Sequence, residues 1–388
     1  AAGYDGVEII GSAGYLLSAF MVRKTNLRTD HWGGPWENRM RFAVEVVRRV
    51  RAAVGERFIV IFRVPAMDML DGGLAWDEIT SLAQALQAAG VSIISTHFCW
   101  HEAPVPTIAT MVPRAAFSQV TGRLRQAVSV PVITSNRINM PDVAEAVLAR
   151  GDADLVSMAR PFLADPQFVR KAREGREDEI NTCIACNQAC LDHYFDGRQQ
   201  VTCLVNPRAC YETELHYRPV AVAKRIAVIG AGPAGLAAAT VAAERGHRVT
   251  LFEAGAEIGG QFNLARRIPG KEEFHETLRY YRRMIDKLGI IGVEVDARIA
   301  GTATGLRDPY GIIVVARTAG GTSDVPLLPK DVIRSVNNRR VGSLDALRDT
   351  VDKLRAFVET IPGVINAEDT RPLPGIEWRG EVDGPPDP

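Results

Sequence analysis

The sequence predicts an α/β protein that begins with a fragment of a parallel (β/α) barrel and continues into a cysteine-rich segment and a nucleotide-binding unit. Three observations carry this prediction. Short β-branched runs alternate with helical stretches over residues 1–165, four cysteines cluster after residue 180, and a glycine-rich turn follows a strand near residue 230. With 388 residues, the chain has room for two or three domains.

The first segment predicts five successive βα units. Apolar residues recur at helical spacing over residues 38–54 and 76–89, and Asn139 is a plausible cap for a helix over residues 141–150. The candidate strands lie at residues 6–10, 58–64, 91–96, 131–134 and 155–158. Repeated βα units favour parallel strands, so we interpret this segment as part of a barrel.

The composition is that of an ordinary globular protein and argues against some partners. Lys plus Arg equals Asp plus Glu at 46 each, and no stretch gathers the basic residues on one face, so we expect no nucleic-acid partner. The longest apolar run, residues 227–243, contains three glycines and a proline, which indicates a dinucleotide turn rather than a membrane span. The chain starts at Ala1 without a signal-peptide pattern, so we expect a cytoplasmic protein that begins inside a domain.

Four cysteines form a candidate metal site. Cys183, Cys186, Cys190 and Cys203 have the spacing Cys-x2-Cys-x3-Cys-x12-Cys, which suits a cubane iron–sulfur cluster held by four thiolates. Structural zinc is the alternative, but zinc sites usually show two paired Cys-x2-Cys knuckles. Because no secretory signal is evident, a disulfide framework is the weaker interpretation.

A glycine fingerprint predicts a dinucleotide site. Gly230, Gly232 and Gly235 follow the apolar strand at residues 226–229 and precede a helix, and Glu253 ends the next strand at the distance expected for a ribose hydroxyl. The glycines let backbone amides and a helix N-terminus approach a pyrophosphate. The spacing does not separate FAD from NAD.

Five polar side chains lie at the ends of predicted barrel strands or follow them, where (β/α) enzymes carry their chemistry. Tyr15 and His101 are candidate proton donors, although a structural role for either is equally compatible with the sequence. Arg63, Arg137 and Arg160 could clamp a phosphate or hold charge on a flavin. A surface salt bridge is the simpler interpretation of any one of these arginines.

Several motifs resemble bacterial NADPH-dependent 2,4-dienoyl-CoA reductase, an iron–sulfur relative of the old yellow enzymes. The cysteine set and the motifs at residues 28–39 (RTDHWGGPWENR), 99–103 (CWHEA) and 157–162 (SMARPF) carry the resemblance, which runs to about residue 288. It implies the last five strands of a partial TIM (β/α) barrel that binds FMN, a [4Fe-4S] loop segment and a Rossmann-like FAD-binding segment. The implied boundaries are residues 1–175, 176–220 and 221–305.

The resemblance also implies a mechanism. Electrons run from NADPH through FAD, the [4Fe-4S] cluster and FMN to a conjugated enoyl thioester, an acyl-CoA, whose protonation involves Tyr15 with the help of His101. Arg63 corresponds to a flavin-ring contact, and Arg137 and Arg160 correspond to the FMN phosphate region. The residues that correspond to the FAD site are Gly230, Gly232, Gly235, Glu253, Gly260 and Gln261.

The chain also departs from this family. The family's first three barrel strands and its NADPH domain have no counterpart in this sequence, so we expect a fragment or a fusion. Residues of about 310–355 resemble part of a bacterial PDZ domain, with Ser343 as a helix cap, which predicts a small α+β segment at 306–360 that binds a C-terminal peptide. The tail at 361–388 is rich in Pro, Gly and acids, and we expect it to be disordered.

Two other functions remain open. An amine dehydrogenase of the same architecture is one, although Trp100, His101 and Glu102 argue against it. The other is a PDZ-like peptide-binding protein that carries a non-functional flavin scaffold.

Overall fold

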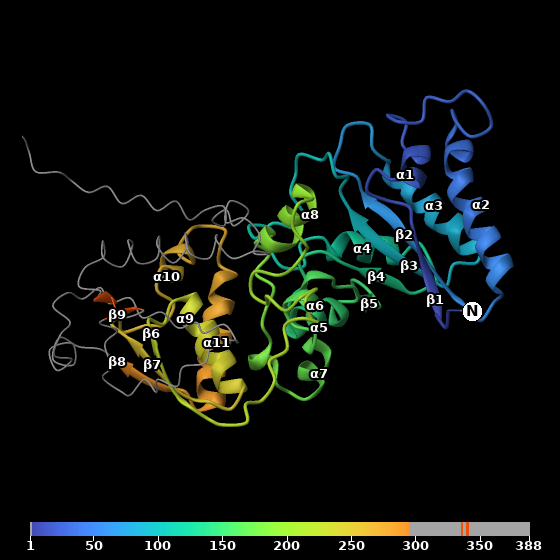
Figure 1. Ribbon diagram of the computed structural model, residues 1–388. Coiled ribbons are helices and arrows are strands. Elements are labelled where there is room, and N and C mark those ends of the chain that lie inside the picture. The colour runs from blue at the N-terminus through green and yellow to red at the C-terminus, as the bar shows by residue number, and fades with distance from the viewer. Residues whose placement is uncertain (1, 295–334, 337–338, 341–388) are drawn as a thin grey trace, which may run out of the picture. The chain divides into compact units, whose positions relative to one another are not determined.

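The computed structural model describes residues 2–294, 335–336 and 339–340 (Figure 1). Residues 1–295 form one compact unit, and residues 296–388 are assigned to a second. In the second unit the described residues form one antiparallel pair, β9 (Ser335–Val336) with β10 (Arg339–Arg340). Apart from this pair, the predicted PDZ-like segment, its Ser343 cap and the tail at 361–388 lie outside the described residues.

A five-stranded parallel sheet forms the first part of the large unit, with the strands in chain order (Figure 1). Its strands are β1 (Gly6–Ile10), β2 (Ile59–Met67), β3 (Ile93–Phe98), β4 (Val132–Thr134) and β5 (Leu155–Val156). The predicted barrel fragment of five βα units is therefore confirmed. Because all five strands run the same way, their carboxyl ends meet at one edge of the sheet.

β2 and β5 differ most from the predicted strands, whereas β4 is one residue shorter and β3 is shifted by two residues. β2 continues past Val64 to Met67, which pairs with Phe98 after a register shift at Pro65. Proline lacks an N–H for the ladder, so a strand interior accommodates it at such an irregularity. β5 ends at Val156, two residues earlier than predicted, and the residues after it line the pocket described below.

Helices connect these strands. The helices of this part are α1 (Leu16–Met21), α2 (Trp36–Val54), α3 (Trp76–Ala88), α4 (Ser118–Arg125), α5 (Pro141–Ala149), α6 (Arg160–Ala164) and α7 (Phe168–Arg173). Asn139 does not cap α5 as predicted. Met140 occupies the cap position and Pro141 starts the helix, because the fixed φ of proline suits the first turn and its missing N–H needs no partner there.

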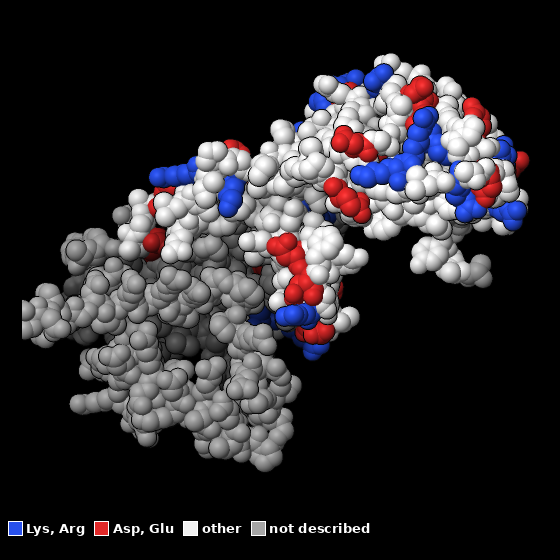
Figure 2. Space-filling model, turned by 90° about the horizontal axis from the view of Figure 1, so that it is seen from above, with Lys and Arg blue, Asp and Glu red and all other residues white. Residues whose placement is uncertain are grey.

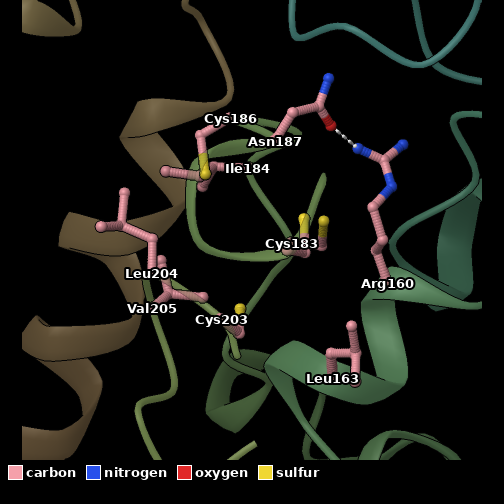
Figure 3. A pocket seen from close by; sticks show the side chains of 10 residues that line it. Arg160, Leu163, Cys183, Ile184, Cys186, Asn187, Cys203, Leu204 and Val205 are labelled. Atoms are coloured by element: carbon pink, nitrogen blue, oxygen red, sulfur yellow. Dashed lines mark hydrogen bonds between the residues drawn. The ribbon is translucent and has the colours of Figure 1, made fainter. Parts of the chain in front are cut away.

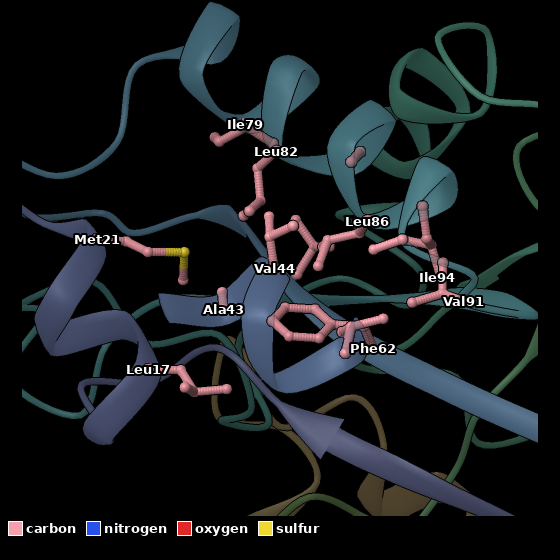
Figure 4. Packing of buried hydrophobic residues seen from close by; sticks show 14 of the residues in the cluster. Leu17, Met21, Ala43, Val44, Phe62, Ile79, Leu82, Leu86, Val91 and Ile94 are labelled. Carbon is pink, nitrogen blue, oxygen red and sulfur yellow. The ribbon is translucent and has the colours of Figure 1, made fainter. Parts of the chain in front are cut away.

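The hydrophobic core lies between the sheet and helices α2 and α3 (Figure 4). On β2, Val60, Phe62 and Val64 are buried in alternation, as a strand with one covered face requires. Leu82 and Leu86 of α3 pack against this face, and burial of each such side chain is worth about 1.5–3 kcal/mol. The alternation turns the intervening residues of β2 to the opposite face of the sheet.

The second part of the large unit contains the cysteine segment and a Rossmann-like unit. The cysteine segment has short helical turns at η1 (Glu177–Glu179), η2 (Gln188–Asp192) and α8 (His193–Asp196). The Rossmann-like unit contains β6 (Arg225–Ile229), α9 (Pro233–Glu244), β7 (Arg248–Glu253), α10 (Phe262–Ala265), α11 (Phe274–Leu288) and β8 (Ile291–Glu294), with β6, β7 and β8 in one parallel sheet. The predicted strand, glycine turn, helix and strand are all present.

Charge and hydropathy agree with the composition. Basic and acidic side chains are interspersed among the described residues on the face shown in Figure 2. Within the described ranges, none of the helices combines the length and the apolar character needed to cross a membrane.

Candidate functional site

An open pocket with about 770 Å³ of empty space lies at the carboxyl ends of β2, β3, β4 and β5. The alternation of side chains along a strand explains part of its lining. Arg63 of β2 pairs with Ser95 of β3, and both side chains face away from the side of the sheet that the helices cover. The loops after β4 and β5 complete the wall with Arg137 and Arg160, among others. The three arginines predicted to contact a flavin therefore line one pocket.

Arg63 also forms a salt bridge, which was the simpler interpretation of an arginine at this position in the sequence. Its Nε and Nη2 donate to Oε1 and Oε2 of Glu8 on β1, at 3.0 and 2.5 Å. Both side chains are 30% exposed, so water screens the pair and it contributes little to stability. The pairing fixes the plane of the guanidinium in the pocket wall, and a planar fork can contact a ring edge.

Arg137 and Arg160 are held by different parts of the chain. Asn136 and Arg137 both have positive φ, at 68° and 56°, which turns the loop after β4 sharply. Arg137 is buried, and its Nε donates to the Val112 carbonyl at 2.7 Å. Arg160 starts α6 and donates to Oδ1 of Asn187 in the cysteine segment (Figure 3).

His97 lines the same pocket and is a residue that sequence reasoning missed. Its Nδ1 is buried and has no hydrogen-bond partner among the described residues. Burial, with smaller contributions from the charges of Arg63 and His101, lowers the pKa of His97 to about 4. The period-2 alternation of β3 would have indicated this residue, but the predicted strand ended one residue before it.

This pKa predicts an acid-sensitive stability. The unfolded chain takes up a proton near the ordinary value of 6.5, whereas the folded chain does not do so until about pH 4. Stability is therefore unaffected by His97 above pH 6.5 and falls as the pH drops towards 4, by about 2 kcal/mol between pH 7 and pH 5. Urea unfolding of wild type and His97→Gln at both pH values measures this, and an equal loss in both proteins would contradict it.

Tyr15 and His101 meet at the same edge of the sheet. The Tyr15 hydroxyl lies 3.0 Å from Nε2 of His101, and the two rings are edge-to-face with centroids 5.3 Å apart. Tyr15 follows β1 and His101 follows β3, so the parallel sheet brings them together. Tyr15 is 51% exposed and neither residue belongs to the pocket wall, so the pair lies outside the wall and the Tyr15 ring is open to solvent.

Trp100 and Asp68 fix the loop that carries His101. Nε1 of the buried Trp100 donates to Oδ1 of Asp68 at 2.9 Å, and Oδ2 of Asp68 accepts the Leu74 N–H at 2.8 Å. Burial raises the pKa of Asp68. Gly14 has φ +89°, and a Cβ there would lie 3.1 Å from the Trp100 ring, so the Tyr15 loop needs glycine at this position.

The four predicted cysteines line a second, smaller pocket beside Arg160 (Figure 3). All four thiols are free. Burial raises the pKa of Cys183 and Cys186 and raises that of Cys203 to about 12, so ligand binding would have to displace protons. Within residues 2–294 and the β9–β10 pair, no three His, Cys, Asp or Glu side chains are grouped to hold a single metal ion.

The glycine loop has the geometry of a nucleotide site. Gly230 has φ +90°, and a Cβ on Gly235 would lie 1.9 Å from the Gly230 carbonyl oxygen. Glu253 accepts the Ala231 N–H at 2.6 Å and the Gly255 N–H at 2.8 Å. Gly260 packs against the same turn, since a Cβ on it would lie 3.2 Å from the Gly232 Cα. Gln261 follows as the residue before α10.

Substitution by alanine is expected to affect dinucleotide affinity at Gly232 and stability at Gly235. Around a Cβ on Gly232, no atom of the described residues lies within 4 Å, and its φ of −71° suits alanine. We expect Gly232→Ala to fold normally but lose dinucleotide affinity, because its methyl group fills the space for the pyrophosphate. Gly235→Ala should lower stability by about 1–3 kcal/mol. Thermal unfolding with FAD titration separates the two effects, and equal melting temperatures would contradict the second expectation.

Two family matches cover these regions. Residues 1–179 match the NADH:flavin oxidoreductase / NADH oxidase family, and residues 228–284 match the NAD(P)-binding Rossmann-like domain. Neither match reaches residues 306–360, so the interpretation of that segment as PDZ-like is not supported.

Characterised relatives extend over both regions. The chain is 46% identical over 301 residues to the metal reductase of Desulforamulus reducens, covering 78% of this chain and 44% of that protein. It is 35% identical over 339 residues to the NADH oxidase of Thermoanaerobacter brockii, covering 84% and 50%. The solved complex of 2-naphthoyl-CoA reductase with 2-naphthoyl-CoA is 37% identical with a TM-score of 0.74, covering 77% of this chain and 46% of that one.

The barrel edge with its arginine-lined pocket and the nucleotide loop together define a flavoprotein architecture. The chain belongs to the NADH:flavin oxidoreductase family, in the group whose barrel is followed by a Rossmann-like segment. It spans about half the length of the curated relatives it matches.

Proposed function

We propose that this chain is part of an NAD(P)H-dependent flavin oxidoreductase that reduces the conjugated C=C bond of an unsaturated acyl-CoA. The observation that carries the proposal is the contact of 3.0 Å between the Tyr15 hydroxyl and Nε2 of His101, at the edge of the sheet that carries the arginine-lined pocket. A phenol held by an imidazole is a suitable proton donor to carbon. The solved relative that binds an aromatic acyl-CoA supports this substrate class.

The arginine-lined pocket has the donors that FMN requires. Arg137 and Arg160 would bind the phosphate, and Arg63 would contact the edge of the flavin ring. Two buried polar atoms in the wall, Nδ1 of His97 and Oδ1 of Asn139, lack partners among the described residues and would gain them from a bound ligand.

The cysteine pocket suits an iron–sulfur cluster better than zinc. Structural zinc sites usually take their ligands from two paired Cys-x2-Cys knuckles, whereas this set contains one such pair, Cys183 and Cys186. In a cluster the four thiolates bind different irons, so they need only surround a common space, as Cys183, Cys186, Cys190 and Cys203 do. The glycine loop with Glu253 would bind FAD, and NADPH would be the electron donor of the whole protein.

The chain's own residues would then direct protonation. Bound FMN would supply the hydride, which adds to the far carbon of the conjugated thioester. Tyr15 would donate its hydroxyl proton to the substrate carbon that gains negative charge, and His101 would return a proton to the Tyr15 oxygen. The hydride and the proton together add one H₂ across the double bond.

Turnover of the reconstituted chain tests the proposal. The chain is loaded anaerobically with FMN, FAD, iron and sulfide, reduced with dithionite and offered a 2,4-dienoyl-CoA. We expect a product that has gained two hydrogens, seen by mass spectrometry. An amine dehydrogenase of the same architecture would leave the thioester unchanged, and its flavin, loaded but not treated with dithionite, would instead be reduced by a secondary amine; that outcome would overturn the proposal.

A further inference from the structure

Glu273 carries a hydrogen-bond network that the proposed function does not use. It precedes α11 in the Rossmann-like unit, and its side chain is 7% exposed. Its carboxylate accepts four hydrogen bonds from three barrel residues. These are Arg114 Nε and Nη2 at 2.8 and 2.6 Å, Arg137 Nη2 at 2.7 Å and Asn139 Nδ2 at 3.0 Å.

Two of these partners lead directly to the candidate cofactor sites. Arg137 and Asn139 both line the arginine-lined pocket. The same Nδ2 of Asn139 also donates to the Cys183 carbonyl at 2.9 Å. One carboxylate therefore holds the loop after β4 and, through Asn139, the backbone of the first cysteine.

α11, which begins directly after Glu273, contacts the cysteine segment and the region of the glycine loop. Arg279 of α11 donates to the Ile180 carbonyl at 2.7 Å and to Oγ1 of Thr182 at 3.0 Å, just before Cys183. Leu278 of α11 lies against Gly259, whose N–H donates to the Ala231 carbonyl in the glycine loop at 2.7 Å. α11 thus joins the nucleotide loop, the cysteine segment and the pocket.

The positive charges of Arg114 and Arg137 keep the Glu273 carboxylate ionised, and they would lose their partner if Glu273 were replaced. Burial alone would raise the pKa of Glu273, but hydrogen bonds and charges from Arg114 and Arg137 outweigh it and lower the pKa. The carboxylate therefore stays ionised beside the buried Arg137. Removal of one partner from a buried ion pair leaves the other charge uncompensated, so Arg137 would rearrange.

We propose that Glu273 is a positioning residue through which the Rossmann-like unit orders the phosphate side of the FMN pocket. Glu273 fixes the guanidinium of Arg137 that the phosphate would meet, and through Asn139 it holds the loop beside that guanidinium, although Glu273 touches no ligand itself. The identity of the ligand rests on the proposed function, whereas the ordering of the loop does not.

FMN affinity and amide hydrogen exchange test this role. Glu273→Gln is compared with Glu276→Gln, a control that removes a carboxylate three residues on, which contacts Arg114 at 3.0 Å and Arg279 at 2.5 Å but neither Arg137 nor Asn139. We expect Glu273→Gln to weaken FMN binding by about tenfold or more and the control to change it by less than about twofold. Exchange should rise at residues 112–116 and 137–140 in Glu273→Gln alone.

Coupling to Arg137 gives a second criterion. If Glu273 acts through Arg137, Glu273→Gln should add little further loss of FMN affinity in an Arg137→Met background. Unchanged exchange and affinity in Glu273→Gln would overturn the role, and so would equal effects in Glu276→Gln. If wild type binds no FMN, the FMN part of the proposed function fails, and hydrogen exchange still decides whether Glu273 orders the loop. Where Glu273→Gln does not fold, Glu273→Asp replaces it, with a smaller but same-signed effect expected.

Discussion

Replacement of Cys203 by serine is expected to remove the iron of the reconstituted protein almost completely. Cys203 comes from the return loop and pairs with Asn206 in an isolated bridge, whereas the other three cysteines lie within eight residues of one another. Without its thiolate, the side of the pocket next to Leu204 and Val205 has no ligand. We expect iron to fall from about four per chain to near zero, together with acid-labile sulfide.

Cys210→Ser is the matched control for this prediction. Cys210 is exposed and lies outside the pocket, so its substitution should leave iron, sulfide and the visible spectrum unchanged. FAD content should stay the same in both variants, because the glycine loop is a separate site. One zinc per wild-type chain with no sulfide would show that the four thiolates hold a single ion, contrary to the cluster assignment.

Local sequence signals predicted most of the fold of residues 1–294. Strand and helix periods depend on neighbouring residues, so the five barrel strands, three of their helices and the strand, glycine turn, helix and strand that begin the Rossmann-like unit could be located to within a few residues. The helices α4 and α11 and the strand β8 were not predicted. The errors fall where contacts between strands decide the outcome. β2 continues to Met67 because Phe98 of β3 pairs with it, and no signal within 58–64 carries that information.

The candidate site was predictable where its residues follow a fixed spacing. The cysteine set and the glycine fingerprint are compact motifs, and each lines one pocket or one turn in the structure. Asn139 and Glu273 were not predictable as partners, because their contact joins positions 134 residues apart. Asn139 even gave a misleading local signal, since it precedes a helix and has the chemistry of a cap.

Replacement of Tyr15 by phenylalanine is expected to slow reduction of a dienoyl-CoA by about 100-fold or more, the usual contribution of a positioned general acid. The hydroxyl that meets Nε2 of His101 is lost, while the ring and the loop around Gly14 are kept. Substrate affinity should change little, because the proton transfer belongs to the transition state. Single-turnover mixing of the reduced protein with the thioester measures the rate directly.

Two comparisons distinguish proton donation by Tyr15 from a general disturbance of the site. Reduction of a ferric chelate needs electrons but no proton on carbon, so Tyr15→Phe should reduce it at the wild-type rate. Tyr194→Phe, at a 65% exposed position on α8, should leave both reactions unchanged. If Tyr15→Phe slows the two acceptors equally, the hydroxyl serves the flavin site rather than the substrate. If it slows neither, the proton comes from another group, and His101, 3.0 Å from the lost hydroxyl, is the first to substitute next.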